Sequence, residues 1–288
     1  NGSGASANYL TSTGTGNPGS QATAAASFST ASDLIRAAAL TEPDNVAYAT
    51  YQAADITHGA SIELARFTIR DGGATTDGDA VGTTLTDLTL AIANGGALRR
   101  VALYDGTTEI AEVAGGTSVS FSSLAGLVAA DGGTKDFSVR ATFNATATDN
   151  QQLQFTVTSA TADAGGSTFA AVDAGGAASL TTGDRNRIEV SATKLVFTSL
   201  PASVTVAQDF TAAVEARDAN ENLDLDNTAS VTLTKASGSG TLSGGGAQSL
   251  VSGARSFTTL QIDDSGSFTL QAAGGGLTAA TSGRSEEH

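Results

Sequence analysis

The sequence predicts an all-β fold of two tandem β-sandwich domains of the immunoglobulin-like (Ig-like) kind, preceded by an extended N-terminal segment. The first observation is composition. Ala, Thr, Gly and Ser supply 158 of the 288 residues, and Thr, Ser and Gly disfavour helix interiors whereas Thr suits strands. The second is that the 58 Val, Ile, Leu and Phe residues recur in short alternating runs, the pattern of half-buried strands. The third is that Gly-rich or Asp-rich turns bound these runs, at the spacing of a sandwich or barrel.

The first element in chain order is the segment of residues 1–31, which is almost entirely Gly, Ser, Thr, Ala and Asn. Its large apolar residues are Tyr9, Leu10 and Phe28, too few to build a core. We expect either a flexible linker or a strand donated to an open sheet edge of another copy. In the second case these three residues are the assembly contacts.

Residues 32–187 are predicted to form the first β-sandwich. Its opening segment, residues 33–39, is either a short helix or an edge strand, because the periodicity fits both. Asp105-Gly106 separates two alternating runs and predicts a hairpin turn. Clean alternation predicts two central strands further on, over residues 137–143 and 153–157, each with one buried face.

Two strands of this first sandwich are expected to contain β-bulges. Leu64 and Phe67 belong to one apolar run but have opposite parity, so a bulge near Ala65 must re-aim the second half of the strand. The same break separates Leu85 from Leu88.

Residues 188–283 are predicted to form the second domain. Seven or eight short alternating runs in about 95 residues is the strand count of an Ig-like domain. The Cys pair and Trp of antibody domains are absent, since the chain has no Cys and no Trp. Residues 284–288 are charged and without pattern, so we expect them to fray.

Several segments resemble a known family. Residues 192–201, 210–220, 240–244 and 266–279 read ATKLVFTSLP, FTAAVEARDAN, GTLSG and GSFTLQAAGGGLTA. They look like the bacterial Ig-like (Big-type) repeat of long secreted cell-surface proteins and adhesins. Upstream, the motifs FTIRDGG, LTDLTL, RVALYDG and DNQQLQFTV are similar to a companion β-module that precedes such repeats. The resemblance covers roughly residues 30–283 and implies an architecture, while fold alone does not fix function.

Composition and charge exclude several functional classes. The absence of Cys removes disulfides, thiolate metal sites and Cys nucleophiles. Lys and Arg number 14 against 29 Asp and Glu, giving a net charge of −15 without a basic cluster, so we expect no nucleic-acid partner. No apolar run reaches the roughly 18 residues of a membrane span. The acidic balance instead suits a self-repelling surface, or one that takes up calcium.

Catalytic signatures are missing from the sequence. The histidines are His58, in a turn-like Thr-His-Gly, and the terminal His288, which leaves little material for a hydrolytic triad. No nucleophile elbow, Walker loop or dinucleotide fingerprint occurs. Glycosidases stack sugars on aromatic rings, whereas this chain has no Trp and 4 Tyr. We therefore predict that the chain is not an enzyme.

Two acidic loops are candidate calcium sites, because a hard cation takes several oxygen ligands from one loop. Neither loop matches an EF-hand, so ordinary solvated acidic turns are the alternative in both. The first candidate has oxygen-bearing side chains at alternate positions, namely Asp218, Asn220, Asn222, Asp224 and Asp226. The second comprises Asp71, Asp77 and Asp79. Calcium is the one cofactor for which the sequence offers candidates.

Together these features predict a non-catalytic structural module of a secreted bacterial surface fibre, stalk or adhesin, located outside the cell. Its expected partners are neighbouring repeats or further copies of itself, which strand donation from the N-terminal segment would join into filaments. The alternative is an adhesion module that binds a surface glycan or protein with the help of calcium.

Overall fold

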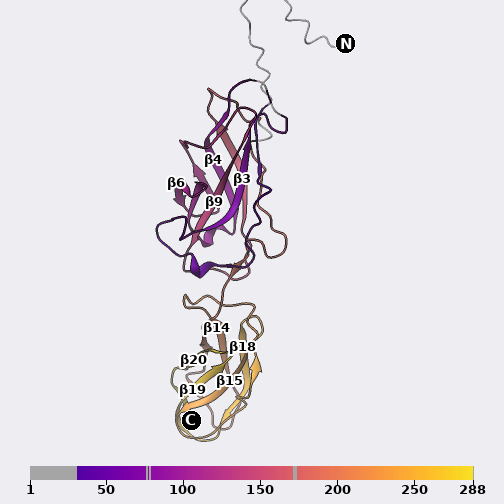
Figure 1. The fold of residues 1–288 in the computed structure, drawn as a ribbon. Helices are drawn as coiled ribbons and strands as arrows, with labels where there is room; N and C mark the ends of the chain where they lie inside the picture. The colour runs from indigo at the N-terminus through magenta and orange to yellow at the C-terminus, as the bar shows by residue number, and fades with distance from the viewer. Residues whose placement is uncertain (1–30, 76, 78, 171–173, 288) are drawn as a thin grey trace, which may run out of the picture.

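The computed structural model describes residues 31–75, 77, 79–170 and 174–287, and it is all-β, as the sequence predicts (Figure 1). Tyr9, Leu10 and Phe28 lie outside these residues, so strand donation stays a prediction. The helical elements found in the described part are two three-residue 3-10 helices, η2 (Tyr48–Thr50) and η3 (Gly95–Ala97). Within the described residues, no helix is long and apolar enough to cross a membrane.

The strands fall into two groups with separate hydrophobic clusters, which we call the first unit and the second unit. The first unit holds β1 (Asp33–Arg36), β2 (Val46–Ala47), β3 (Ile62–Arg70), β4 (Thr83–Ala93), β5 (Leu98–Asp105), β6 (Thr108–Ala114), β7 (Ser118–Phe121), β8 (Val128–Ala129), β9 (Thr134–Phe143), β10 (Gln154–Ala162) and β11 (Ile188–Glu189). The second unit holds β12 (Lys194–Ser199), β13 (Ser203–Val204), β14 (Phe210–Arg217), β15 (Ser230–Ser237), β16 (Leu242–Ser243), β17 (Gln248–Ser249), β18 (Ala254–Ile262), β19 (Gly266–Gly274), β20 (Leu277–Thr281) and β21 (Ser285–Glu287). Figure 1 shows the two units end to end along one long axis.

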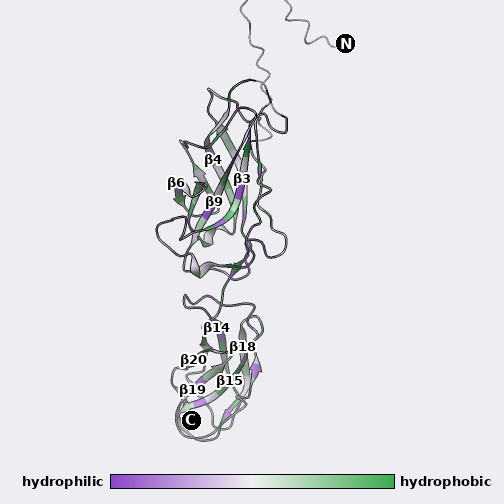
Figure 2. Ribbon diagram, in the orientation of Figure 1, coloured by the Kyte–Doolittle hydropathy of each residue, from purple (hydrophilic) through white to green (hydrophobic). Residues whose placement is uncertain are grey.

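The first unit is built from two main sheets. One has the order β1-β3-β9-β5-β6, and the other has the order β10-β4-β7 with β8 also paired to β4. Their apolar side chains form a single cluster that includes Phe67 and Phe137, which are cross-strand partners with ring centroids 5.9 Å apart. Apolar and polar residues are interspersed along the strands (Figure 2), as expected where a thin sheet buries one face and exposes the other.

Local predictions for the first unit are mostly confirmed. Residues 33–36 form an edge strand, which decides between helix and strand. The pairing of β3 with β9 shifts register between Glu63 and Ala65, which is the predicted bulge. The pairing of β10 with β4 skips Thr86, which gives the second predicted bulge, between Leu85 and Leu88. The hairpin also forms: Asp105 pairs with Thr108 across a two-residue loop.

The two predicted central strands differ from expectation. β9 is central, but both of its faces are buried, because the segment before β3 covers the second face. Arg140 on that face donates hydrogen bonds to the Ser61 hydroxyl (3.0 Å) and to the His58 carbonyl (2.7 Å). The prediction that β10 is central is wrong, because β10 ends its sheet. Backbone hydrogen bonds to residues 176–179 cover its outer edge.

The C-terminal segment also departs from the sequence-based expectation. We predicted that residues 284–288 fray, whereas Ser285–Glu287 form β21, antiparallel to β19 and parallel to β13. The Ser285 hydroxyl, fully buried, donates to the Pro201 carbonyl at 2.8 Å. Backbone pairing therefore orders a segment whose side chains carry no apolar pattern.

The chain leaves the first unit slightly later than the predicted boundary between residues 187 and 188. Ile188 and Val190 are fully buried in the first cluster, and β11 pairs with β2 in parallel. Leu195 is the first buried residue of the second cluster. The connection between the units is therefore only a few residues long.

The central position of β9 gives a stability prediction. Val139→Ala, at a fully buried site, removes two methyl groups from the core and should lower the free energy of unfolding by about 2–3 kcal/mol. Val128→Ala makes the same change at a side chain that is 47 % exposed and should change it by less than about 0.5 kcal/mol. Urea unfolding followed by tyrosine fluorescence compares the two. Equal effects would contradict the burial described for β9.

Candidate functional site

The junction between the units is centred on Tyr48, the first residue of η2. Its side chain is fully buried and its ring packs edge-on against Phe143, with centroids 6.3 Å apart. Its hydroxyl donates to the Asp218 carboxylate and accepts from the side-chain amides of Asn220 (3.0 Å) and Asn222. One hydroxyl of the first unit thus contacts three side chains that follow β14 in the second unit.

Asn222 adds two hydrogen bonds to the backbone of the first unit. Its amide nitrogen donates to the Ala145 carbonyl at 2.7 Å, and its amide oxygen accepts from the Ala147 N–H at 3.1 Å. Asp218 holds the turn that presents Asn222, because one of its oxygens accepts from the backbone N–H groups of Asn220 (2.9 Å) and Asn222 (2.8 Å). Asp218 therefore holds the loop in the conformation that places Asn222 against the backbone of the first unit.

A second set of hydrogen bonds holds the connecting segment from both sides. Asp149 of the first unit accepts from the N–H groups of Val190 (2.8 Å) and Leu225 (2.7 Å). Asp224 of the second unit accepts from the Ala192 N–H at 2.9 Å. Both aspartates are buried, and a buried carboxylate that accepts backbone N–H bonds is a strong, directional contact.

These contacts give the first predicted calcium loop a different role. The oxygens of Asp218 and Asp224 face N–H and O–H donors, and Asp226 accepts from the Asn150 amide at 2.8 Å. Among the described residues, the three aspartates of this loop do not bring their carboxylate oxygens within 4.8 Å of one another. In this structure the loop of residues 218–226 connects the two units through hydrogen bonds. Calcium binding at this loop stays a prediction.

Several acidic side chains lie close together at the junction, and their pKa values are shifted. Burial raises the pKa of the Asp149 carboxyl, and Asp226 and Asp224 raise it further, while the Val190 and Leu225 N–H groups act in the opposite direction. Burial also raises the pKa of Glu189, with Asp149 as the largest of the neighbouring charges. Burial, followed by the hydrogen bond to Asp218, raises the pKa of Tyr48 to about 12.

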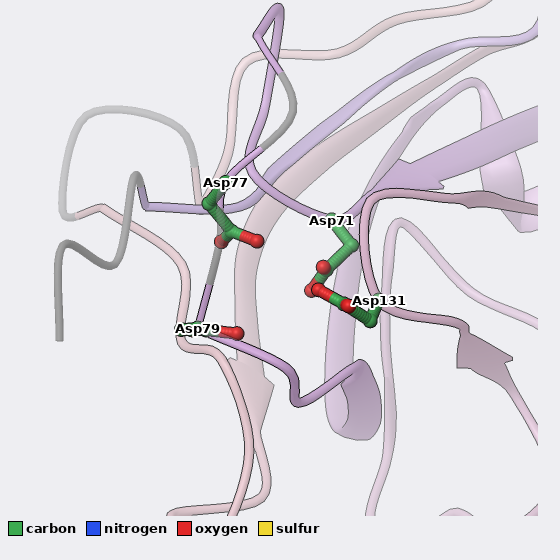
Figure 3. A group of neighbouring side chains, drawn as sticks. All are labelled: Asp71, Asp77, Asp79 and Asp131. Atoms are coloured by element: carbon green, nitrogen blue, oxygen red, sulfur yellow. The ribbon is translucent and has the colours of Figure 1, made fainter. Parts of the chain in front are cut away.

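The second predicted calcium loop comes together in space with one further aspartate (Figure 3). Asp71 follows β3, Asp77 and Asp79 lie in the connection to β4, and Asp131 precedes β9. One carboxylate oxygen from each of the four lies within 4.8 Å of the others. Of the groups of metal-ligating side chains in the described residues, this is the one that meets that distance.

Asp71 is the anchored member of this cluster. It is 2 % exposed, and it accepts from the Thr83 hydroxyl at 2.6 Å and from the Gly132 N–H at 2.8 Å. Asp79 accepts from the Val81 N–H (2.9 Å) and the Ser167 hydroxyl (2.8 Å). These hydrogen bonds hold the carboxylates of Asp71 and Asp79 in place. Asp77 and Asp131 are the other two members of the cluster.

Asp77 has no such support. Both of its carboxylate oxygens are buried without a hydrogen-bond partner in the described part of the chain. Burial raises the pKa of this carboxyl, and Asp71, Asp79 and Asp131 raise it further, while the backbone N–H of Asp79 acts in the opposite direction. Gly72 allows the close approach: its φ is +71°, and a Cβ there would lie 2.7 Å from the Asp77 nitrogen.

Asp131 is the member of this cluster that the sequence did not predict. It lies far from Asp71 along the chain, and only the antiparallel pairing of β3 with β9 brings the two turns together. One signal was present: Asp131-Gly-Gly repeats the Asp71-Gly-Gly motif, and each is a turn at the same end of this strand pair.

His58 lies in neither site. It is exposed, and its ring packs edge-on against Tyr104 with the ring centroids 6.0 Å apart. It borders a hollow of about 390 Å³ that Glu63, Arg66 and Asp136 also line, where Arg66 is already paired with Glu63 at 2.7 Å.

Comparison with known proteins does not assign a family. No protein-family model matches the chain, and no curated protein matches it. Among solved structures, a β-glycosidase from Bacteroides vulgatus is 11 % identical, with a TM-score of 0.30 over 88 % of this chain and 24 % of the other. The Yersinia pseudotuberculosis adhesin InvE is 12 % identical, with a TM-score of 0.29 over 89 % and 58 %. Domains 4 and 5 of the S-layer protein SbsC are 14 % identical, with a TM-score of 0.28 over 65 % and 98 %.

These scores are too low to carry an argument about function, and the chain spans only about a quarter of the glycosidase. The family resemblance therefore stays a prediction.

The Tyr48 hydroxyl gives a prediction at neutral and alkaline pH. Tyr48→Phe should lower the free energy of unfolding by about 1–3 kcal/mol at pH 7, because it removes a hydroxyl that donates to the buried Asp218 carboxylate and accepts from the Asn220 and Asn222 amides. The folded state holds the Tyr48 proton more tightly than the unfolded state does. Its contribution is therefore complete below pH 10 and lost as the pH rises towards about 12. Absorbance titration of the wild type minus Tyr48→Phe should show a tyrosine ionising near pH 12; a difference titration near pH 10 would contradict the buried hydroxyl.

Repulsion at the junction gives a second prediction. Glu189→Gln should raise the free energy of unfolding at pH 7 by a few tenths of a kcal/mol, because it removes a charge that Asp149, Asp226 and Asp224 disfavour. A raised carboxyl pKa costs stability as the pH rises from about 4.5, so the gain should shrink at pH 4. Chemical unfolding at both pH values measures it, with the exposed Asp55→Asn as the control. A loss of stability at pH 7 would show that Glu189 is favourably paired.

Proposed function

We propose that this chain is a rigid, non-catalytic spacer: two β-sandwich units that hold a fixed end-to-end arrangement within a secreted bacterial surface stalk, fibre or adhesin. The observation that carries the proposal is the junction around Tyr48. A flexible tether between domains needs no side chains that cross from one unit to the other. Here Tyr48 and Asn222 each bond to the opposite unit and are buried.

The geometry of these contacts favours rigidity over simple proximity. Asp149, in the first unit, bonds to the connecting segment through Val190 and to the second unit through Leu225. Asp224, in the second unit, bonds to the same segment through Ala192. Rotation of one unit would leave these buried carboxylates without their hydrogen-bond donors. Each buried carboxylate that loses its donor costs about 1–3 kcal/mol of stability or more.

Placement outside the cell rests on composition. The chain has a net charge of −15 and consists largely of Ala, Thr, Gly and Ser, which suits a structural material whose copies repel one another. A glycan-binding or protein-binding module is the second hypothesis. The hollow beside His58 is the feature that would serve it, but its arginine is already paired with Glu63.

Distance measurements between the units test the spacer directly. The chain has no cysteine, so Val128→Cys and Val251→Cys, at sites 47 % and 66 % exposed, place one spin label on each unit. Double electron–electron resonance should give a single narrow distance distribution, which Tyr48→Phe combined with Asn222→Ala should broaden.

The matched control is Tyr104→Phe, which removes a buried tyrosine hydroxyl that bonds Glu109 within the first unit. This variant should leave the distribution narrow. A broad distribution in the labelled parent protein would overturn the proposal, as would equal broadening by Tyr104→Phe.

A further inference from the structure

We propose that Asp71, Asp77, Asp79 and Asp131 form a calcium site at the end of the first unit where the chain enters it. Oxygens bound to one calcium ion lie at 2.3–2.6 Å from it, so any two of them are at most about 5 Å apart. One oxygen from each of the four carboxylates satisfies this condition, since all lie within 4.8 Å of one another. The inference concerns a ligand and is independent of the spacer function.

The unpartnered carboxylate of Asp77 is the second observation. Asp77 is a partly buried residue, but both of its carboxylate oxygens are buried and have no hydrogen-bond partner in the described residues. Figure 3 shows this carboxylate directed towards Asp71, in the space that the four side chains share. A buried carboxylate is costly unless it is hydrogen-bonded or bound to a cation, and here its neighbours are three further carboxylates. A bound cation supplies the missing partner.

The donor set selects the type of cation. All four side-chain ligands are carboxylates, with no His or Cys in the group, which disfavours zinc and other metals that prefer nitrogen or sulfur. Magnesium keeps most of its waters and binds through one or two carboxylates, whereas calcium accepts several carboxylates in an adaptable geometry. Four converging aspartates therefore suit calcium.

The site joins two connections that lie far apart in the chain. Asp71, Asp77 and Asp79 belong to the connection between β3 and β4, and Asp131 belongs to the connection between β8 and β9. The Thr83 hydroxyl that donates to Asp71 lies 2.6 Å from the Ser32 hydroxyl, just before β1. An ion at the carboxylates would therefore also stabilise the entry of the chain into the first unit.

An NMR titration of the chain with calcium chloride tests the site. Extracellular calcium modules bind with dissociation constants of about 0.1–1 mM, so titration to about 10 mM should saturate. We expect saturable shifts of the Gly72, Gly132 and Ser32 amide signals, and weaker ones with magnesium. Asp77→Asn and the exposed Asp131→Asn should each weaken calcium binding by about tenfold or more.

Two controls make the outcome decisive. Asp55→Asn removes an exposed carboxylate elsewhere in the first unit, and Asp209→Asn removes an exposed one in the second unit, just before β14; both should leave the calcium affinity unchanged. The spectra report folding of each variant directly. No saturable shift at 10 mM calcium would overturn the proposal, as would unchanged affinity in both Asp77→Asn and Asp131→Asn, or loss of binding in Asp209→Asn with binding kept in Asp77→Asn.

Discussion

The buried hydroxyl of Tyr48 is the interaction on which the arrangement of the two units depends. It is the one side-chain group of the first unit, within the described residues, that bonds to Asp218, Asn220 and Asn222 together. Because Asp218 also shapes the turn that carries both asparagines, the hydroxyl and the loop require each other. Loss of the hydroxyl would remove one donor from the buried Asp218 carboxylate and one acceptor from the two asparagine amides, so this small set of hydrogen bonds favours one orientation of the two units.

This dependence on polar contacts follows from the composition. Only 58 of 288 residues are Val, Ile, Leu or Phe, and the structure uses many of them inside the two separate clusters. Little apolar surface remains for a hydrophobic interface between the units. Aspartate, asparagine and tyrosine therefore hold the junction, and Asp71 with its neighbours performs a comparable task at the other end of the first unit, where the turns around β3 and β9 meet.

The sequence predicted most of the local structure and little of the long-range placement. Parity breaks located the bulges near Ala65 and between Leu85 and Leu88, because side-chain alternation is a local property. The same alternation did not show that β10 ends its sheet, since edge and centre depend on which strands pair. Oxygen spacing identified residues 218–226 as a candidate calcium loop, and calcium there stays a prediction; the hydrogen bonds of this loop to the first unit could not be predicted, because a sequence does not show which backbone N–H groups lie nearby. Asp131 was missed since strand pairing alone brings it to Asp71.

Residual dipolar couplings can show whether the two units move as one body, as we propose. Amide couplings measured for β3, β9 and β5 in the first unit, and for β14, β18 and β19 in the second, each define an alignment tensor. We expect one tensor, with one magnitude and orientation, to fit both sets in the frame of the structure. Two tensors of different magnitude would contradict it, because they would show that the units reorient independently despite the hydrogen bonds of Tyr48.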